Sequence, residues 1–202
     1  MLSYLATALP QGTSPSAHLL AVQCALRMNT RMQVHLPKGV LRSLRLNTTS
    51  DPWHELEHAR WLRPAPGNAA NETTAELLDV TLLSQAPAGP DRRRAADWAL
   101  RAGSSSATGA AEPLPRLAGV YLAAHTDLES GSGLGELDRM ARACGAQPAE
   151  LTSTLDQLAA TGLLGTWQVC PDSGDLQWIF ARGTGIPAGD PQWEAVRGIV
   201  RG

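Results

Sequence analysis

The chain has 202 residues, carries a net charge of −2 and is 43% apolar, which is ordinary for a folded protein of one or two small domains. A net charge this low argues against a protein that coats nucleic acid indiscriminately. No apolar run approaches the roughly 20 residues that span a bilayer, and residues 1–12 lack the positive charge of a secretory signal. The three cysteines form no C-x-x-C pair, which argues against a zinc ribbon or a disulfide framework. We therefore expect a cytoplasmic protein without membrane contact.

In the first half, apolar spacing predicts helices that alternate with short strands. A helical stripe with Ser16 as its N-cap precedes a short strand in which every second residue is apolar. Pro37 opens a second helix, and Asp51-Pro52 marks the N-cap and first turn of a third. The alternating run at residues 78–82 predicts the second arm of a β-hairpin, and a closing helix is expected over residues 91–101.

Residues 102–113 are small, polar and without apolar periodicity, so they predict a flexible linker between two units. The second unit opens with two helical stripes. A third helix is expected to begin at Pro148 and to end at Gly162, which suits a left-handed C-cap. The glycine-rich stretch at residues 129–135 is expected to form a turn between helices. Two alternating runs around the turn PDSGD predict a β-hairpin over residues 164–180.

Three helices followed by a hairpin, with LDQLAATGLLGTW leading into the hairpin, resemble the winged helix-turn-helix over residues 116–181. The first half shows the same order, and its stretch WHELEHARWL aligns with LDQLAATGLL without a gap, with the apolar anchors coinciding. The resemblance implies a mainly α fold with small β-hairpin wings (class α+β), built from two tandem winged-helix units of the bacterial transcriptional-regulator type. The expected units are residues 1–101 and 114–182, with the linker at 102–113 and a tail with a short helix at 183–202.

The stretch HELEH at residues 54–58 also matches the zinc-protease pattern H-E-x-x-H, in which two histidines hold zinc and the glutamate activates water. That chemistry needs a third ligand, and the nearest candidates, Glu72 and Glu76, lie in a stretch broken by Pro, Gly and Asn. Glu57 places a charge where the protease pattern generally has none. The internal alignment instead makes HELEH part of a third helix whose core residue is Leu56.

Motifs for other chemistry are missing from the sequence, which has no phosphate-binding loop, no dinucleotide-binding glycine pattern and no nucleophile elbow. We therefore expect no catalytic residues, no bound metal, no cofactor and no enzymatic activity. The zinc protease is kept as the weakest alternative.

Charge separates the two units. Residues 1–101 carry 11 Lys and Arg against 8 Asp and Glu, whereas residues 102–202 carry 6 against 11. The contrast sharpens at the helices and hairpins, with a net +4 over residues 27–63 and −6 over residues 117–181. Because DNA phosphates attract Lys and Arg, we expect the first unit to bind DNA. The acidic second unit is expected to make protein contacts, with its tryptophans at 167 and 178 either as anchors or as core residues.

A winged-helix unit of this kind would place its third helix in the major groove and the preceding helix against phosphates. A glutamate of HELEH on the same face would be repelled by phosphate unless it accepts a hydrogen bond from cytosine. Side chains of the second helix, the turn, the third helix and the entry to the wing are the candidates for DNA contact: Arg42, Arg45, Asn47, Thr48, Thr49, His54, His58, Arg60 and Arg63.

Together these features predict a sequence-specific transcriptional regulator that binds double-stranded DNA as a homodimer paired through its C-terminal half. Two alternatives stay open on the sequence. One is a non-enzymatic tandem winged-helix adaptor, as in chromosome-segregation complexes, and the other is a plasmid replication or segregation protein.

Overall fold

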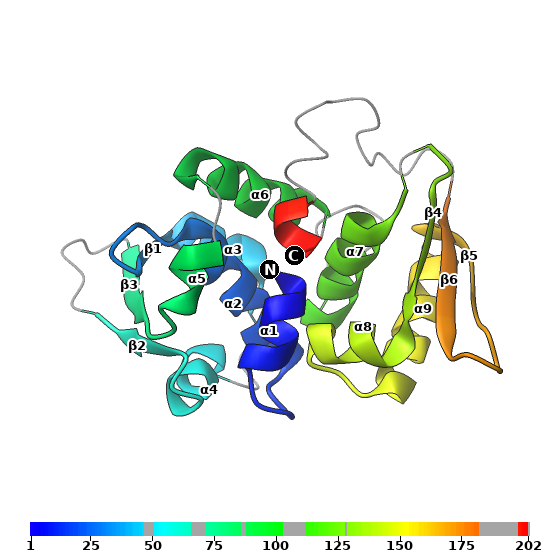
Figure 1. Ribbon diagram of the computed structural model, residues 1–202, viewed down its shortest axis with the longest axis horizontal. Helices are drawn as coiled ribbons and strands as arrows, with labels where there is room; N and C mark the ends of the chain where they lie inside the picture. The colour runs from blue at the N-terminus through cyan, green and yellow to red at the C-terminus, as the bar shows by residue number, and fades with distance from the viewer. Residues whose placement is uncertain are drawn as a thin grey trace.

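A computed structural model of the protein describes residues 1–46, 51–65, 72–85, 88–102, 112–127, 129–181 and 198–201. Within these residues, two separate, small antiparallel sheets lie toward opposite sides of the view with helices between them, which is an α+β arrangement (Figure 1). Among the described helices, none has the length and apolar character that a membrane span requires.

The N-terminal half folds around the sheet β1-β3-β2, in which β3 pairs antiparallel with both neighbours. Val34 of β1 lies opposite Ala75 of β3, and Leu62 of β2 lies opposite Leu77. In chain order the elements are α1 (Leu2–Ala8), α2 (Pro15–Arg27), β1 (Gln33–Pro37), α3 (Lys38–Leu44), α4 (Pro52–His58), β2 (Leu62–Pro64), β3 (Glu72–Leu77), α5 (Thr81–Gln85) and α6 (Gly89–Ala102).

The C-terminal half repeats the order helix, strand, helix, helix, strand, strand. Its sheet is β4-β6-β5, again with the last strand in the middle, and Trp178 of β6 lies opposite both Gly133 and Trp167. The elements are α7 (Pro113–His125), β4 (Ser132–Glu136), α8 (Leu137–Cys144), α9 (Pro148–Ala160), β5 (Leu164–Val169) and β6 (Asp175–Phe180), and a helical turn at residues 198–201 follows.

Helices α4 and α9, each the third helix of the repeated order, end in the same hydrogen-bond pattern. The amide of Trp61 donates to the Leu56 carbonyl at 3.0 Å, and the amide of Leu163 donates to the Leu158 carbonyl at 2.9 Å. All four side chains are buried. The gap-free alignment of WHELEHARWL with LDQLAATGLL is therefore confirmed at the level of backbone hydrogen bonds for this part of the helix.

Several caps were predicted correctly. Asp51 caps α4 by accepting from the amides of Trp53 and His54 at 3.0 and 3.3 Å. α9 begins at Pro148, and Gly162 beyond its end has a φ of 78°. The N-cap of α2 was misplaced by sequence reasoning. It is Ser14, not Ser16, because Pro15 already occupies the first helical turn.

Two predicted elements are wrong. Residues 78–82 do not form the second arm of the hairpin, since the strand is β3 at Glu72–Leu77 and α5 begins at Thr81. Asp79 starts that helix by accepting hydrogen bonds from the amide and hydroxyl of Thr81 at 2.9 and 2.7 Å. The stretch at residues 129–135 is only partly a turn, because its end belongs to β4 at Ser132–Glu136, which pairs along β6.

Candidate nucleic-acid interface

Helix α3 has one apolar face and one cationic face. Leu44 is buried and Val40 and Leu41 are half-buried, so this side of the helix faces the core. Lys38 and Arg42 lie one turn apart on α3, Arg45 follows as the C-cap of the helix, and all three are exposed. In the part of the chain that the structure describes, none of the three forms an ion pair with a carboxylate. We define these three residues as the cationic face of α3.

Helix α4 presents two histidines to solvent. Pro52 and Leu56 are buried, which leaves His54, Glu57 and His58 exposed. The two histidines are one turn apart, and they line a shallow hollow of about 320 Å³ against the loop at residues 10–13. The structure therefore groups the histidines with each other on α4 and the cations with each other on α3.

Glu55 is half-buried and lines the same hollow as the two histidines, but its carboxylate is engaged by another element. Its carboxylate accepts hydrogen bonds from the amide and the hydroxyl of Ser14, both at 2.8 Å, at the start of α2. Glu55 therefore holds α4 against α2, and of the two glutamates in HELEH only Glu57 is exposed. The described residues contain no group of three or more His, Cys, Asp or Glu side chains that could hold a metal ion.

The other residues predicted to contact DNA differ in whether their side chains are exposed and free of a carboxylate partner. Arg60 is exposed beyond the end of α4, at the entry to β2. Arg63 in β2 faces Glu76 in β3 and donates to its carboxylate through Nη2 at 2.7 Å and Nε at 3.0 Å, so its charge is already balanced. Residues 47–49 lie outside the described residues, and the roles expected for Asn47, Thr48 and Thr49 stay predictions.

The C-terminal half has no equivalent of the cationic face. The carbonyl of Arg42 accepts from the amide of Arg45 at 3.2 Å, and the carbonyl of Arg142 accepts from the amide of Gly145 at 3.2 Å, so the two arginines are structural counterparts. In this alignment Asp138 stands where the first half has Lys38. The three cations of α3 and its C-cap thus correspond to one acid, one arginine and one glycine in α8 and its C-cap.

The backbone adds a second difference between the halves. Within the described residues, three non-glycine residues of the N-terminal half have positive φ, and each corresponds to a glycine in the C-terminal half. The pairs are Met32 (61°) with Gly131 (67°), Arg45 (48°) with Gly145 (63°), and Arg60 (55°) with Gly162 (78°). The left-handed conformation costs a residue with a side chain about 1 kcal/mol or more. Two arginines of the candidate site therefore occupy positions that favour glycine.

Sequence reasoning missed Lys38 as a candidate, although its helical spacing from Arg42 was the available signal. One of the three correspondences between a positive-φ residue and a glycine could also be predicted from the sequence, because the gap-free alignment places Arg60 on Gly162. The orientation of Glu55 could not be read from α4 alone, since it depends on the packing of α2.

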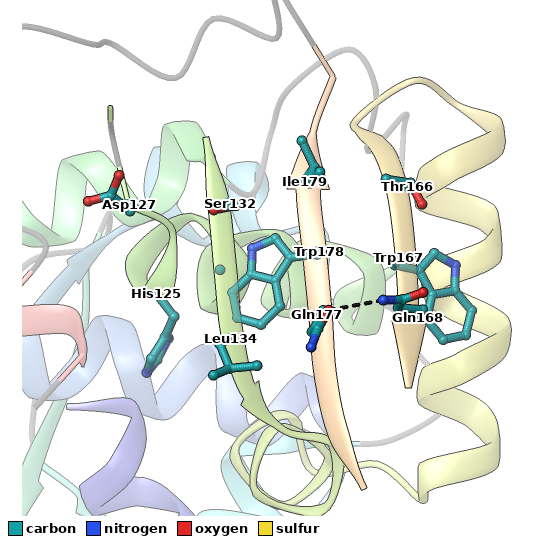
Figure 2. Close-up of a pocket in the computed structure, with 11 residues that line it drawn as sticks. His125, Asp127, Ser132, Leu134, Thr166, Trp167, Gln168, Gln177, Trp178 and Ile179 are labelled. Carbon is teal, nitrogen blue, oxygen red and sulfur yellow. Dashed lines mark hydrogen bonds between the residues drawn. The ribbon is translucent and has the colours of Figure 1, made fainter. Parts of the chain in front are cut away.

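The sheet β4-β6-β5 of the C-terminal half borders a hollow of about 550 Å³ (Figure 2). Trp178 is buried, and its indole Nε1 donates to Thr126 Oγ1 at 2.7 Å. A Cβ added to Gly133 would clash with the indole ring. Trp178 is thus a core residue, whereas Trp167 is half-buried. Leu134 and Ile179, each next to Gly133 or Trp178 along its strand, are exposed and line the hollow.

His125, at the edge of this hollow, is held neutral by its surroundings. Its ring stacks on Tyr121 with the ring centroids 4.0 Å apart, and its Nδ1 lies 2.8 Å from the Tyr121 carbonyl. Burial, helped by the positive charges of Arg139 and Arg201, lowers the pKa of His125 to about 4. A neutral imidazole with Nδ1–H donating to the backbone therefore contributes to packing at neutral pH.

Comparison with known proteins gave no match: no family model, no curated protein and no solved structure is similar to the chain.

Proposed function

We propose that the protein is a tandem winged helix-turn-helix protein that binds double-stranded DNA and regulates transcription, with the N-terminal half as the DNA-binding half. The order helix, strand, helix, helix, strand, strand with the last strand in the middle of the sheet, found in both halves, supports the winged-helix assignment. Fold likeness alone does not establish DNA binding, so the argument rests on the side chains.

The observation that carries the proposal is the cationic face of α3. Lys38 and Arg42 on α3 and Arg45 at its C-cap are exposed and have no carboxylate partner among the described residues. Such a row favours contact with a polyanion, because neutralising phosphates releases counterions. The C-terminal half provides an internal comparison, since the same positions there carry Asp138, Arg142 and Gly145 and no net charge.

The two left-handed arginines add to this argument. Arg45 and Arg60 stand where the C-terminal half has glycine, although glycine adopts positive φ with no steric penalty. Residues kept in unfavourable backbone conformations cluster at functional sites. Charge at these two positions is a reason for arginine to be present despite the cost.

In the proposed complex, α4 enters the major groove and α3 lies along the phosphate backbone. His54 and His58 are exposed and carry ring nitrogens that can reach base edges. Glu55 does not oppose this arrangement, because its carboxylate is bound to Ser14. Arg60 adds a positive charge at the entry to the wing, and Arg63 contributes less because of its pairing with Glu76.

The test is selection of duplexes from a random library by the full-length protein, followed by footprinting of the tagged protein in its own cell. The proposal expects an enriched sequence motif and discrete genomic sites. An absence of enrichment in both experiments contradicts DNA-binding regulation.

A protein adaptor is the second candidate, and one observation favours it. Leu134 and Ile179 are 62% and 46% exposed on the outer face of the second sheet, next to the uncharged pair Gln168 and Gln177. The three strands of this sheet carry no Lys or Arg, so the face suits protein contact more than DNA contact. An adaptor would show no duplex enrichment, and Leu134→Asp would remove its association with partner proteins.

A further inference from the structure

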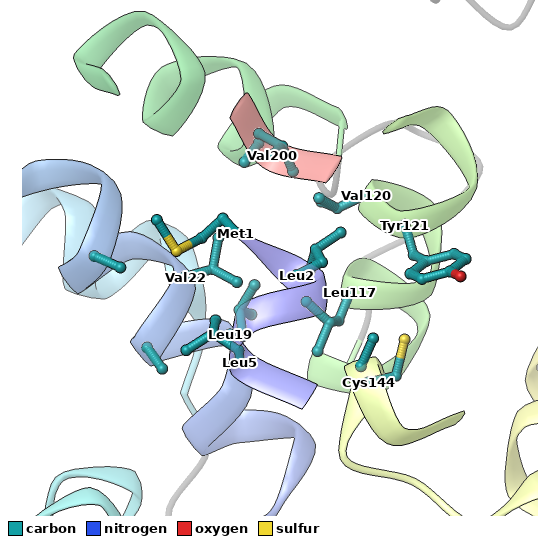
Figure 3. Packing of buried hydrophobic residues seen from close by; sticks show 14 of the residues in the cluster. Met1, Leu2, Leu5, Leu19, Val22, Leu117, Val120, Tyr121, Cys144 and Val200 are labelled. Carbon is teal, nitrogen blue, oxygen red and sulfur yellow. The ribbon is translucent and has the colours of Figure 1, made fainter. Parts of the chain in front are cut away.

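The two halves pack through corresponding helices. α2 contacts α7, and each begins with a proline in its first turn and turns an apolar side toward the other half. Leu19 and Val22 of α2 and Leu117 and Val120 of α7 are all buried in one continuous cluster. Figure 3 shows this cluster, to which α1, α8 and the turn at residues 198–201 also contribute.

The ends of these helices make reciprocal contacts. His18, the fourth residue of α2, lies against the end of α8, where a Cβ added to Gly145 would come 2.5 Å from its Nδ1. Arg116, the fourth residue of α7, donates from Nη1 to the Ser43 carbonyl near the end of α3 at 2.7 Å. Each half therefore touches the end of the other half's second helix from the same position of its own first helix.

Reciprocal contacts of this kind are the signature of a two-fold axis, in which one surface patch meets its own copy. Here the two patches belong to one chain and differ in sequence. Neighbouring elements cover the junction: α1 packs on both α2 and α8, and α6 packs on both α2 and α7. Ser3 joins the two ends of the chain, since its hydroxyl donates to the Arg201 carbonyl at 2.9 Å.

We infer that the C-terminal half occupies, within one chain, the place that a second copy would take in a dimeric DNA-binding protein. One chain then binds one DNA site that has no two-fold symmetry. This inference rests on the proposed function and replaces the homodimer expected from the sequence. The apolar helix faces that would pair two copies are already buried against each other inside the chain.

The charges of the two halves agree with a single DNA-binding half. Under the internal two-fold, the cationic face of α3 corresponds to the surface of α8 that carries Asp138 and Arg142. The exposed His54 and His58 of α4 align with Asp156 and Ala160 of α9, which offer DNA an acid and a methyl group. A symmetric DNA site would therefore meet two unlike surfaces and gain little from its second half-site.

The mass of the full-length free protein is the first test. Sedimentation equilibrium at several micromolar concentrations should give one species at the chain mass of 21.4 kDa. A stable species of twice this mass would overturn the inference. If Leu134→Asp then restored the single-chain mass, the outer sheet face would be the dimer contact and the internal pairing would not replace self-association.

Stoichiometry on DNA is the second test and separates this inference from the proposed function. Duplexes selected by the full-length protein should carry a motif without inverted repeats, and native mass spectrometry should find one chain per duplex. An inverted repeat bound by two chains overturns the inference and leaves DNA binding intact. If no duplex is enriched, the proposed function and the DNA part of the inference both fail, whereas the single-chain mass still supports the internal pairing.

Discussion

Arg60 and Gly162 occupy the same backbone position in the two halves of the protein. Each follows the last residue of a third helix by two positions and has a positive φ, 55° for Arg60 and 78° for Gly162. Their amides donate to the carbonyls of Glu57 and Ala159 at 2.9 and 3.0 Å. The two helix ends are built alike, and only the N-terminal half places a charged side chain there.

Arg60→Gly is expected to raise the free energy of unfolding by about 0.5–1 kcal/mol, because glycine removes the steric cost of the left-handed conformation. The same change is expected to weaken DNA binding, because it removes an exposed cation. Urea unfolding and fluorescence anisotropy measure the two effects separately. A variant that loses stability, or gains stability with unchanged affinity, would contradict a functional reason for arginine at this position.

Helix ends and third-helix cores were the most predictable part of the fold. Local signals fix them: Asp51-Pro52 caps and opens α4, and Gly162 suits the left-handed position after α9. Strands β3 and β4 were missed for the opposite reason. The sequence of β3, ETTAEL, has little apolar alternation, and β4, SGLGE, is glycine-rich, so both depend on partners distant in sequence.

β4 shows why local composition misleads here. Gly133 sits directly under the indole of Trp178, and no side chain fits between them. Glycine therefore belongs to this strand because of a tryptophan that comes much later in the chain. The candidate site divides in the same way: the exposure of Arg42, His54 and His58 follows helical periodicity, whereas the engagement of Glu55 depends on the packing of α2.

The junction between the halves can be tested with two glycines. Both Gly145 and Gly162 have positive φ, so alanine at either position costs about 1 kcal/mol from backbone strain. At Gly145 the new Cβ would also lie 2.5 Å from His18 Nδ1 and 2.6 Å from the Thr13 carbonyl, whereas at Gly162 nothing lies within 4 Å.

Gly145→Ala is therefore expected to lower the free energy of unfolding by about 2–4 kcal/mol, and Gly162→Ala by about 1 kcal/mol. Urea denaturation of the two full-length variants measures the difference. Equal losses would mean that Thr13 and His18 are not closely packed against the end of α8.

The role of Glu55 separates a structural from a metal-binding interpretation of HELEH. Glu55→Ala removes two hydrogen bonds to Ser14 and is expected to destabilise the protein by about 1–3 kcal/mol. The exposed neighbour supplies the control, since Glu57→Ala is expected to change stability by no more than about 0.5 kcal/mol.

Elemental analysis of untagged protein should find no stoichiometric zinc. About one zinc per chain that disappears in His58→Ala would revive the protease alternative.

Acidification is expected to destabilise the protein through His125. Its pKa is about 4 in the folded protein and near 6.5 in the unfolded chain, so the unfolded state binds more protons between these values. The part of the free energy of unfolding that depends on His125 is therefore fully present above pH 6.5 and decreases as the pH falls toward 4. His125→Gln keeps a side-chain donor without the titration, and its stability should fall less between pH 6.5 and 4 than that of the parent protein. Parallel curves would contradict this assignment.

The DNA-binding face can be tested by comparing counterpart residues. Lys38→Ala and Arg42→Ala each remove an exposed cation, and each is expected to reduce the slope of log affinity against log salt by roughly 1. Because phosphate contacts carry no sequence information, the loss should be similar on selected and unrelated duplexes. Arg142→Ala removes the counterpart of Arg42 from the C-terminal half and should leave the slope unchanged.

His54→Ala provides the complementary measurement. A side chain that reads a base should cost roughly 1–3 kcal/mol on the selected site and little on unrelated duplexes. Anisotropy titrations at several salt concentrations resolve both effects in one experiment. If Arg142→Ala lowers the slope while Lys38→Ala and Arg42→Ala do not, the C-terminal half is the DNA-binding half, and net charge does not determine which half binds.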